Sequence, residues 1–325
     1  MKLRNLDLSP DPVNEEHQEL GLPPVEEAVL HPGDHPVLKL FAWLAAFMLL
    51  SAVGYLLLRF FNFSGSVASA ESLVMDALTS KVFWSAVLVG VVAQTIDGAL
   101  GMAYGITSNT FLLASGISPA IATASVHIAE VFTTGVSGLS HIRMKNVNPK
   151  LFFRLLIPGL IGAISGAYFV SSIDGDVLKP YISGYLVIMG LYLVSKIFHH
   201  YQPTQDEPKH VAKLALFGGF VDSVGGGGWG PVVTTTLIGS GHDPRMTIGS
   251  VNFAEFFLTF GSAIAFSVLV GSGPWPIVVG LVLGGVFAAP FAALLTRKVH
   301  AKTLLIMVGV LISIVSAANF YNAIK

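Results

Sequence analysis

The sequence of 325 residues contains no cysteine and few charged residues. The absence of cysteine excludes disulfide bonds, thiolate metal sites and a cysteine nucleophile. Only 11% of the residues are charged and 53% are hydrophobic, whereas soluble domains are about 25% charged. This composition excludes a soluble globular protein. The 18 basic residues form no basic arm of the kind that binds nucleic acid, so we expect no nucleic-acid partner.

Several catalytic signatures are also missing. The sequence has no His-Glu-x-x-His, no Gly-x-Ser-x-Gly and no Walker lysine, so zinc hydrolase, serine hydrolase and ATP-driven chemistry have no support. We therefore expect neither an enzyme nor a metal or other cofactor.

Long uncharged runs are abundant. The first covers about 38–61, and the others cover 82–96, 99–126, 155–173, 180–195, 214–221, 256–296 and 303–324. Apolar runs of about 18 residues or more predict helices that cross a bilayer. We expect an all-α polytopic membrane protein that contacts lipid along nearly all of its length after Val37.

The N-terminal segment differs from the rest of the chain. Residues 1–35 contain two basic residues, eight acidic residues and five prolines, a composition that buries little core. We expect a disordered acidic tail over residues 1–36, followed by one anchor helix and an external loop over 37–79.

An internal repeat divides the remainder of the chain. A shift of 125 positions, without a gap, places residues 97–134 on 222–259, and about 14 of the 38 pairs are identical. The identical pairs include Asp97 with Asp222, Gly105 with Gly230, Pro119 with Pro244, and Glu130 with Glu255. We expect two related transport repeats, 80–198 and 211–325, joined by a linker at 199–210.

Loop charges indicate that the two repeats have opposite orientations. The loop after the Glu130 helix is basic, whereas its counterpart at 271–275 is uncharged and the following loop, 297–302, is basic. Loops rich in Lys and Arg stay in the cytoplasm. We expect an inverted-topology pair, with the N-terminus cytoplasmic and the C-terminus external.

Each repeat begins with arms that are too short to cross a bilayer. The arms 214–224 and 229–240 have 11 or 12 residues and are separated by Gly225–Gly228, whereas a span needs about 20 residues. The first repeat has the matching segment 81–116. Irregular backbone at membrane depth is stable where it is buried or lines a polar cavity. We expect two broken, re-entrant hairpins whose tips form a central site; two short crossing helices would preserve the same topology.

Four carboxyl groups lie in apolar surroundings, Asp97 and Asp222 at the hairpin tips and Glu130 and Glu255 in the following helices. An ionised carboxylate at the bilayer centre costs about 2.5–3.5 kcal/mol on insertion scales, and such groups usually face a cavity. One interpretation is that they carry protons for an exporter. The other is that they bond to hydroxyl groups or backbone amides and fix the hairpins.

Helix N-termini present free N–H groups, which bind an anion without Lys or Arg. The candidate ligands lie at the start of each second arm and on the two following helices: Tyr104, Thr107, Ser108, Asn109, Thr110, His127, Trp229, Thr234, Thr235, Thr236 and Asn252. A hydrogen-bonded histidine in a helix interface is the simpler interpretation of His127, since Asn252 stands at the matching position. Alternatively, the glycines allow close helix packing and the hydroxyls bond back to carbonyls.

Three spacings carry a resemblance to a known family: Asp-Gly-x-x-Gly-x-x-x-Gly at 97–105, Ser-Gly-x-x-Pro at 115–119, and Ala and Glu eight positions apart at 122 and 130. With their repetition from Asp222 to Glu255, they resemble the TauE/SafE permease family over about 80–322. The resemblance implies a bacterial plasma-membrane exporter of sulfite or a small sulfonate such as sulfoacetate. The chain departs from the pattern in its acidic tail, its anchor helix and the sparser glycines of its first repeat.

Three functions remain open at this point. The first is a secondary transporter that exports a small anion by alternating access, with the anion and the lipid bilayer as its partners. The second is a channel or cation permease that uses the carboxylates. The third is an intramembrane aspartyl protease that uses Asp97 and Asp222. This fits poorly, because such proteases resemble Tyr-Asp and Gly-x-Gly-Asp motifs, whereas Ile96 and Val221 precede the two aspartates here. The sequence leaves the oligomeric state open.

Overall fold

The structure, a computed structural model, describes residues 35–64, 75–100, 102–198, 208–271, 275–298 and 301–325. Within these ranges the longer elements are all helices: α2 Pro36–Ser64, α4 Lys81–Leu100, α5 Tyr104–Ala114, α6 Pro119–Arg143, α7 Pro149–Ser172, α8 Gly175–Ser195, α9 Val211–Gly225, the π-helical turn η3 Gly230–Thr234, α10 Thr235–Gly239, α11 Pro244–Leu269, α12 Trp275–Lys298 and α13 Ala301–Ile324. Most of the expected tail and linker lie outside the described residues.

Five of these helices are long and apolar enough to cross a membrane. They are Pro36–Tyr55, Pro149–Ser172, Gly175–Ser195, Arg245–Leu269 and Ile306–Ile324. Three shorter apolar helices accompany them: Lys81–Thr95, Gly230–Gly239 and Trp275–Ala288. The part of the chain that the structure describes is thus all-helical, with five candidate membrane spans.

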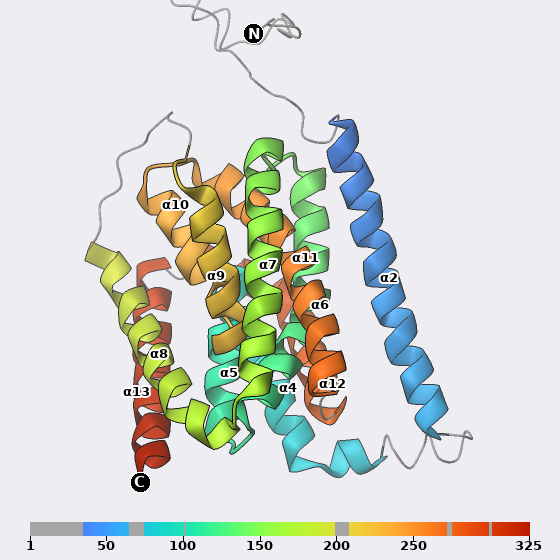
Figure 1. The fold of residues 1–325 in the computed structure, drawn as a ribbon, viewed down its shortest axis with the longest axis vertical. Coiled ribbons are helices and arrows are strands. Elements are labelled where there is room, and N and C mark those ends of the chain that lie inside the picture. Colours follow the sequence, from blue (N-terminus) through green and yellow to red (C-terminus); the bar gives the residue numbers. More distant parts are fainter. Residues whose placement is uncertain (1–34, 65–74, 101, 199–207, 272–274, 299–300) are drawn as a thin grey trace, which may run out of the picture.

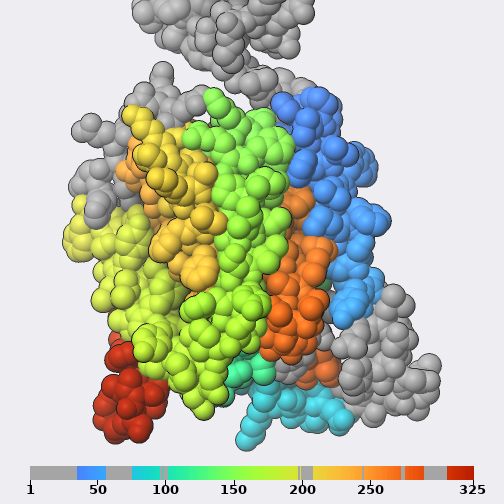
Figure 2. All heavy atoms as spheres, in the orientation of Figure 1, coloured from blue at the N-terminus to red at the C-terminus, as the bar shows by residue number. Residues whose placement is uncertain are grey.

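Large apolar side chains cover the outside of the bundle. Trp43 is 77% exposed, Tyr181 73% and Val268 79%. Such a surface would be unstable in water and matches the hydrocarbon of a bilayer. In Figure 2, α8, α9 and α7 lie side by side on one face of the bundle, and orange helical segments of the second half show between α7 and α2.

The first arm of each hairpin packs against a long helix of the other half of the chain. The first arm α4 lies against α12, and the first arm α9 lies against α7. Glycines permit both contacts, since a Cβ at Gly284 would overlap the carbonyl oxygen of Val87 and one at Gly162 would overlap that of Leu216. Each first arm therefore packs on a helix from the other half of the chain.

Both hairpins are broken near the middle of the bundle. α4 ends at Leu100 and α5 begins at Tyr104, while α9 ends at Gly225 and η3 begins at Gly230. Gly226 has a φ of 67°, which a helix does not allow. Figure 1 shows α9 and α10 toward one end of the bundle and α4 and α5 toward the other, where the C-terminus also lies.

The turn that closes the first hairpin recurs in the second. Ser115 donates from its backbone N and its Oγ to the carbonyl oxygen of Phe111, and Ser240 does the same to Thr236. The following glycines, Gly116 and Gly241, have φ values of 83° and 89°, a left-handed conformation typical of helix ends. The Ser-Gly pair that is shared between the halves therefore builds the same local structure twice.

Candidate functional site

The tips of the two hairpins touch each other. Asn109 in α5 donates from Nδ2 to the carbonyl oxygen of Gly225 at 2.5 Å. A Cβ on Gly105 would lie 2.5 Å from the carbonyl oxygen of Gly226. The glycines at these positions are therefore what allows one broken helix to rest on the first turn of the other.

A carboxyl group closes each break. Asp222 accepts at Oδ1 from the backbone N–H groups of Gly228 and Trp229, at 2.8 and 3.0 Å. Asp97 accepts at Oδ1 from the backbone N–H of Tyr104 at 3.3 Å. Tyr104 and Trp229 are 125 positions apart, as are the two aspartates. The hydrogen bond from the backbone N–H of the aromatic residue to the aspartate is therefore the same in both halves.

His127 ties α6 to the second tip. Its Nδ1 lies 2.9 Å from the carbonyl oxygen of Thr123, and its Nε2 lies 3.2 Å from Oδ2 of Asp222. A carbonyl oxygen only accepts, so Nδ1 must donate, and one further proton lies between Nε2 and Oδ2. Whichever atom holds that proton, the pair has no net charge. At the matching position, Asn252 accepts from Ser137 at 3.4 Å.

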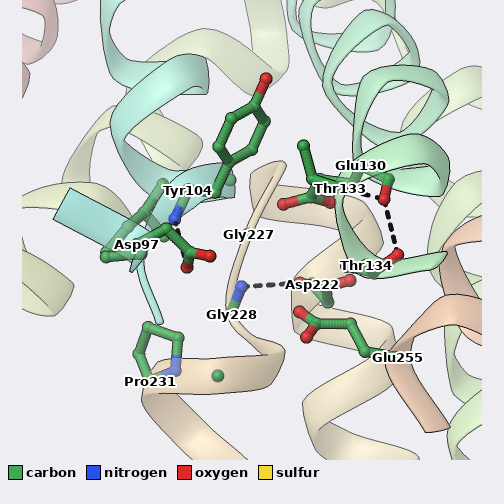
Figure 3. Close-up of a pocket in the computed structure, with 14 residues that line it drawn as sticks. Asp97, Tyr104, Glu130, Thr133, Thr134, Asp222, Gly227, Gly228, Pro231 and Glu255 are labelled. Carbon is green, nitrogen blue, oxygen red and sulfur yellow. Dashed lines mark hydrogen bonds between the residues drawn. The ribbon is translucent and has the colours of Figure 1, made fainter. Parts of the chain in front are cut away.

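A small cavity lies where these tips meet α6 and α11. The side chains and backbone that line it include Asp97, Tyr104, Gly105, Ile106, Glu130, Thr133, Thr134, Asp222, Gly227, Gly228, Pro231 and Glu255. Figure 3 shows Asp97 and Tyr104 on one side, Glu130, Asp222 and Glu255 on the other, and the glycine backbone between them. The four carboxyl groups that the sequence singled out thus come together at one place.

The cavity is small in this structure. It offers about 20 Å³ to the centres of water-sized molecules, which is room for about one water. A larger ligand can therefore enter only if the walls move apart.

Glu130 has a buried carboxyl oxygen without a partner among the described residues. This oxygen is Oε2, and the side chain is 4% exposed. The hydroxyl groups of Thr133 and Thr134 donate to the backbone carbonyl of Glu130 instead of its carboxyl group, at 3.2 and 2.5 Å. An unpartnered buried polar atom costs about 1–3 kcal/mol, so its presence beside a cavity indicates a functional group.

Comparison with known proteins settles the family. Residues 86–319 match the family model described as "Sulfite exporter TauE/SafE". This chain belongs to the TauE/SafE family. No solved structure is significantly similar to it.

Curated relatives of this TauE/SafE protein are bacterial. It is 44% identical over 244 residues to "Probable membrane transporter protein YtnM" of Bacillus subtilis (strain 168), a match that covers 72% of this chain and 81% of the relative. It is 21% identical over 266 residues to "Probable membrane transporter protein YunE" of the same organism, covering 73% and 97%. A third relative, "Probable membrane transporter protein ORF9" of Sinorhizobium sp, is 29% identical over 242 residues, covering 69% and 87%.

Membership establishes the class of function. The chain is a multi-pass membrane transporter of the TauE/SafE family, and the family and relatives are transporters, not enzymes. This confirms that the protein is not an enzyme and removes the aspartyl protease from consideration. The acids at Asp97 and Asp222 therefore belong to a transport pathway or to its scaffold.

The candidate anion ligands of this TauE/SafE transporter occupy several different places. Of these candidates, only Tyr104 is among the described residues that line the cavity. Thr107, Ser108 and Asn109 are fully buried one turn further along α5, and the side-chain oxygens of all three have no hydrogen-bond partner among the described residues. Thr110 lies beside α13, with its Oγ1 3.3 Å from Oγ of Ser316.

The candidate anion ligands of the second repeat do not line the cavity. Trp229 is fully buried and donates from Nε1 to the carbonyl oxygen of Val251 at 3.1 Å. Thr234 is also buried, Thr235 contacts the hydroxyl of Tyr192 at 3.1 Å, and Thr236 is exposed. Trp229 and Thr235 therefore hold helices together in this conformation.

Tyr185 is a contributor that the sequence did not reveal. Its hydroxyl donates to the carbonyl oxygen of Gly227 at 3.0 Å and so fixes the second tip from α8. Tyr185 lies outside the aligned segment 97–134, and one tyrosine in an apolar helix gives no signal of such a contact.

Proposed function

We propose that this transporter exports a small anion, most of all sulfite or a small organosulfonate, by alternating access. The observation that carries the proposal is the direct contact of two broken helix tips around a buried polar cavity. Broken helices at the centre of a transporter are typical of substrate sites. The family description names sulfite, and we extend it to this chain on that basis.

An inverted repeat of 80–198 and 211–325 is part of this proposal. The repeated turn, the repeated aspartate bond and the opposite ends from which the hairpins enter all support it. In addition, Thr134 and Thr259, which are 125 positions apart, face each other with their hydroxyl oxygens 3.4 Å apart. Contact between equivalent residues is what a two-fold axis produces. With the basic loops inside, the N-terminus is cytoplasmic and the C-terminus external.

We place the anion at the first turn of α5. Gly105 and Ile106 belong to this turn and line the cavity, and the first amides of a helix have no intrahelical acceptor. The unpartnered hydroxyls of Thr107 and Ser108 follow directly. Rocking of the two halves about the contacting tips then exposes this turn to one side of the membrane at a time.

Protons are the coupling ion in this scheme. Glu130 and Glu255 line the cavity together with Asp97 and Asp222, so each conformation exposes acids of both halves to the same solution. Protonation on one side and release on the other would then link the proton gradient to export.

One observation favours a second candidate, a cation permease. The lining contains four carboxyl groups and no Lys or Arg among the described residues. Two like charges 4 Å apart repel by about 4 kcal/mol at an effective dielectric constant of about 20, whereas a helix N-terminus contributes at most about 2 kcal/mol. Ionised acids therefore suit a cation, and an anion requires protonated acids.

Transport assays in proteoliposomes separate the two candidates. We expect vesicles loaded with unlabelled sulfite or sulfoacetate to accumulate the labelled anion by counterflow, and protein-free vesicles to accumulate none. Sodium or potassium flux without anion counterflow would instead establish the permease and overturn the export proposal.

A further inference from the structure

The carboxyl group of Glu130 lies on the backbone of α5. Its Oε1 is 2.8 Å from the point where a Cβ on Gly105 would stand. Gly105 is the second residue of α5, so the carboxyl group faces the first turn of this helix. Tyr104 and Thr107 donate their amides to Asp97 and Ala103, whereas the amides of Gly105 and Ile106 have no intrahelical acceptor. A glycine at position 105 leaves the space that the carboxyl group and a ligand share.

The surroundings of Glu130 contain no cation among the described residues that line the cavity. The titratable groups facing it are Asp97 from α4, Tyr104 from α5, Asp222 from α9 and Glu255 from α11. His127 on α6 is directed to Asp222, and that pair has no net charge. Tyr185 from α8 donates its hydroxyl to the tip backbone. An ionised Glu130 would therefore have neither a counter-ion nor a donor at Oε2.

We propose that Glu130 in its protonated form is itself an anion ligand, whose carboxyl O–H donates a hydrogen bond to an S–O⁻ oxygen held at the first turn of α5. This assignment rests on the proposed function, because it takes a sulfur oxyanion as the substrate. It gives Glu130 a direct contact with substrate in addition to proton coupling. The proton comes from solvent and is bound with the anion.

The consequence is positive linkage between anion and proton. A carboxylate repels the anion and a carboxylic acid donates to it, so each ligand raises the affinity for the other by the same factor. Anion and proton therefore occupy the cavity together, so export carries protons outward and is driven by the gradient of the anion. Glutamine donates from its amide without titrating, so Glu130→Gln keeps the contact and removes the linkage.

Calorimetry on the purified full chain in detergent tests this assignment. The probe is isethionate, a sulfonate whose own charge is constant between about pH 5.5 and 8, with sulfite as a second probe. For the wild type we expect the isethionate affinity to fall by up to about tenfold per pH unit, the limit for one linked proton. Titrations in buffers of different ionisation enthalpy should show proton uptake on binding. Glu130→Gln should bind with little dependence on pH and take up fewer protons than the wild type.

Two further variants make the result decisive. Glu130→Leu has a side chain of similar size without a donor. It should lose isethionate binding across the whole pH range, while its thermal unfolding remains cooperative. Asp176→Asn removes an exposed carboxyl group in the first turn of α8 and should behave as the wild type. Equal pH dependence and proton uptake in Glu130→Gln and the wild type would overturn the assignment and leave the export proposal standing. No binding of either probe to the wild type at any pH would overturn both.

Discussion

Asp222 and His127 join the second hairpin to α6, with Oδ2 and Nε2 3.2 Å apart and both side chains almost completely buried. The equivalent pair, Asp97 of the first repeat and Asn252 of the second, is not joined in this way among the described residues, and Asn252 accepts from Ser137 instead. The second tip is therefore held by more bonds than the first. In a transporter that moves between two states, we therefore expect the tip of the first hairpin to detach from its neighbours more easily than the tip of the second.

Removal of the two aspartates should have unequal effects on stability. Asp222→Ala leaves two buried amides and His127 without their acceptor, so we expect a loss of about 3–5 kcal/mol, as for a broken buried pair. Asp97→Ala removes one longer bond and should cost about 1 kcal/mol. Thermal unfolding of the purified variants in detergent measures both.

Asp222→Asn is the matched control for this comparison. Its carbonyl oxygen still accepts from both amides, so its stability should lie between those of the wild type and Asp222→Ala. Equal losses for the alanine variants at 97 and 222 would contradict the unequal bonding.

A methyl group at the second tip should disrupt the contact between the hairpins. Gly227 has a φ of 149°, and a Cβ there would overlap the backbone of Gly105 and Ile106. We expect Gly227→Ala to lose about 2–4 kcal/mol from strain and overlap and to lose anion counterflow. Counterflow and thermal unfolding check the two effects.

Gly54→Ala in α2 provides the control, since a Cβ at that position has no neighbour within 4 Å. It should change stability by at most about 1 kcal/mol and leave counterflow intact. If Gly227→Ala behaved in the same way, the tips would not need to touch for transport.

The sequence predicted the backbone of the site better than its side chains. The breaks after Leu100 and Gly225 lie where the glycine spacing placed them, because only glycine allows two helices to meet at this distance. The four acids line one cavity, as expected of carboxyl groups in apolar helices, which usually face the bundle interior or a cavity.

Side-chain directions in the second arm were not predictable in the same way. The π-helical turn η3 at Gly230–Thr234 changes the angular position of the residues that follow. As a result, Thr235 contacts Tyr192 and Thr236 is exposed. A helical wheel assumes regular periodicity, so it could not show that these hydroxyls lie away from the cavity.

Neutral substitutions at the two glutamates should uncouple transport from the proton gradient. Glu130→Gln and Glu255→Gln remove a titrating group from the cavity lining while preserving side-chain size. We expect each to abolish uptake driven by a pH difference across vesicles and to spare anion exchange, which needs no net proton movement. Unchanged pH-driven flux in both variants would reject proton coupling through these residues.

The central claim is that two copies of one unit lie in opposite orientations across the membrane, and the absence of cysteine makes it directly measurable. Ser115 and Ser240 are exposed, end equivalent turns and are 125 positions apart. Single-cysteine variants at these positions can be labelled with a membrane-impermeant maleimide in intact cells and in inverted vesicles. The account predicts that Ser115→Cys is labelled from outside the cell and that Ser240→Cys is labelled only in inverted vesicles. Labelling of both cysteines from the same side would contradict it.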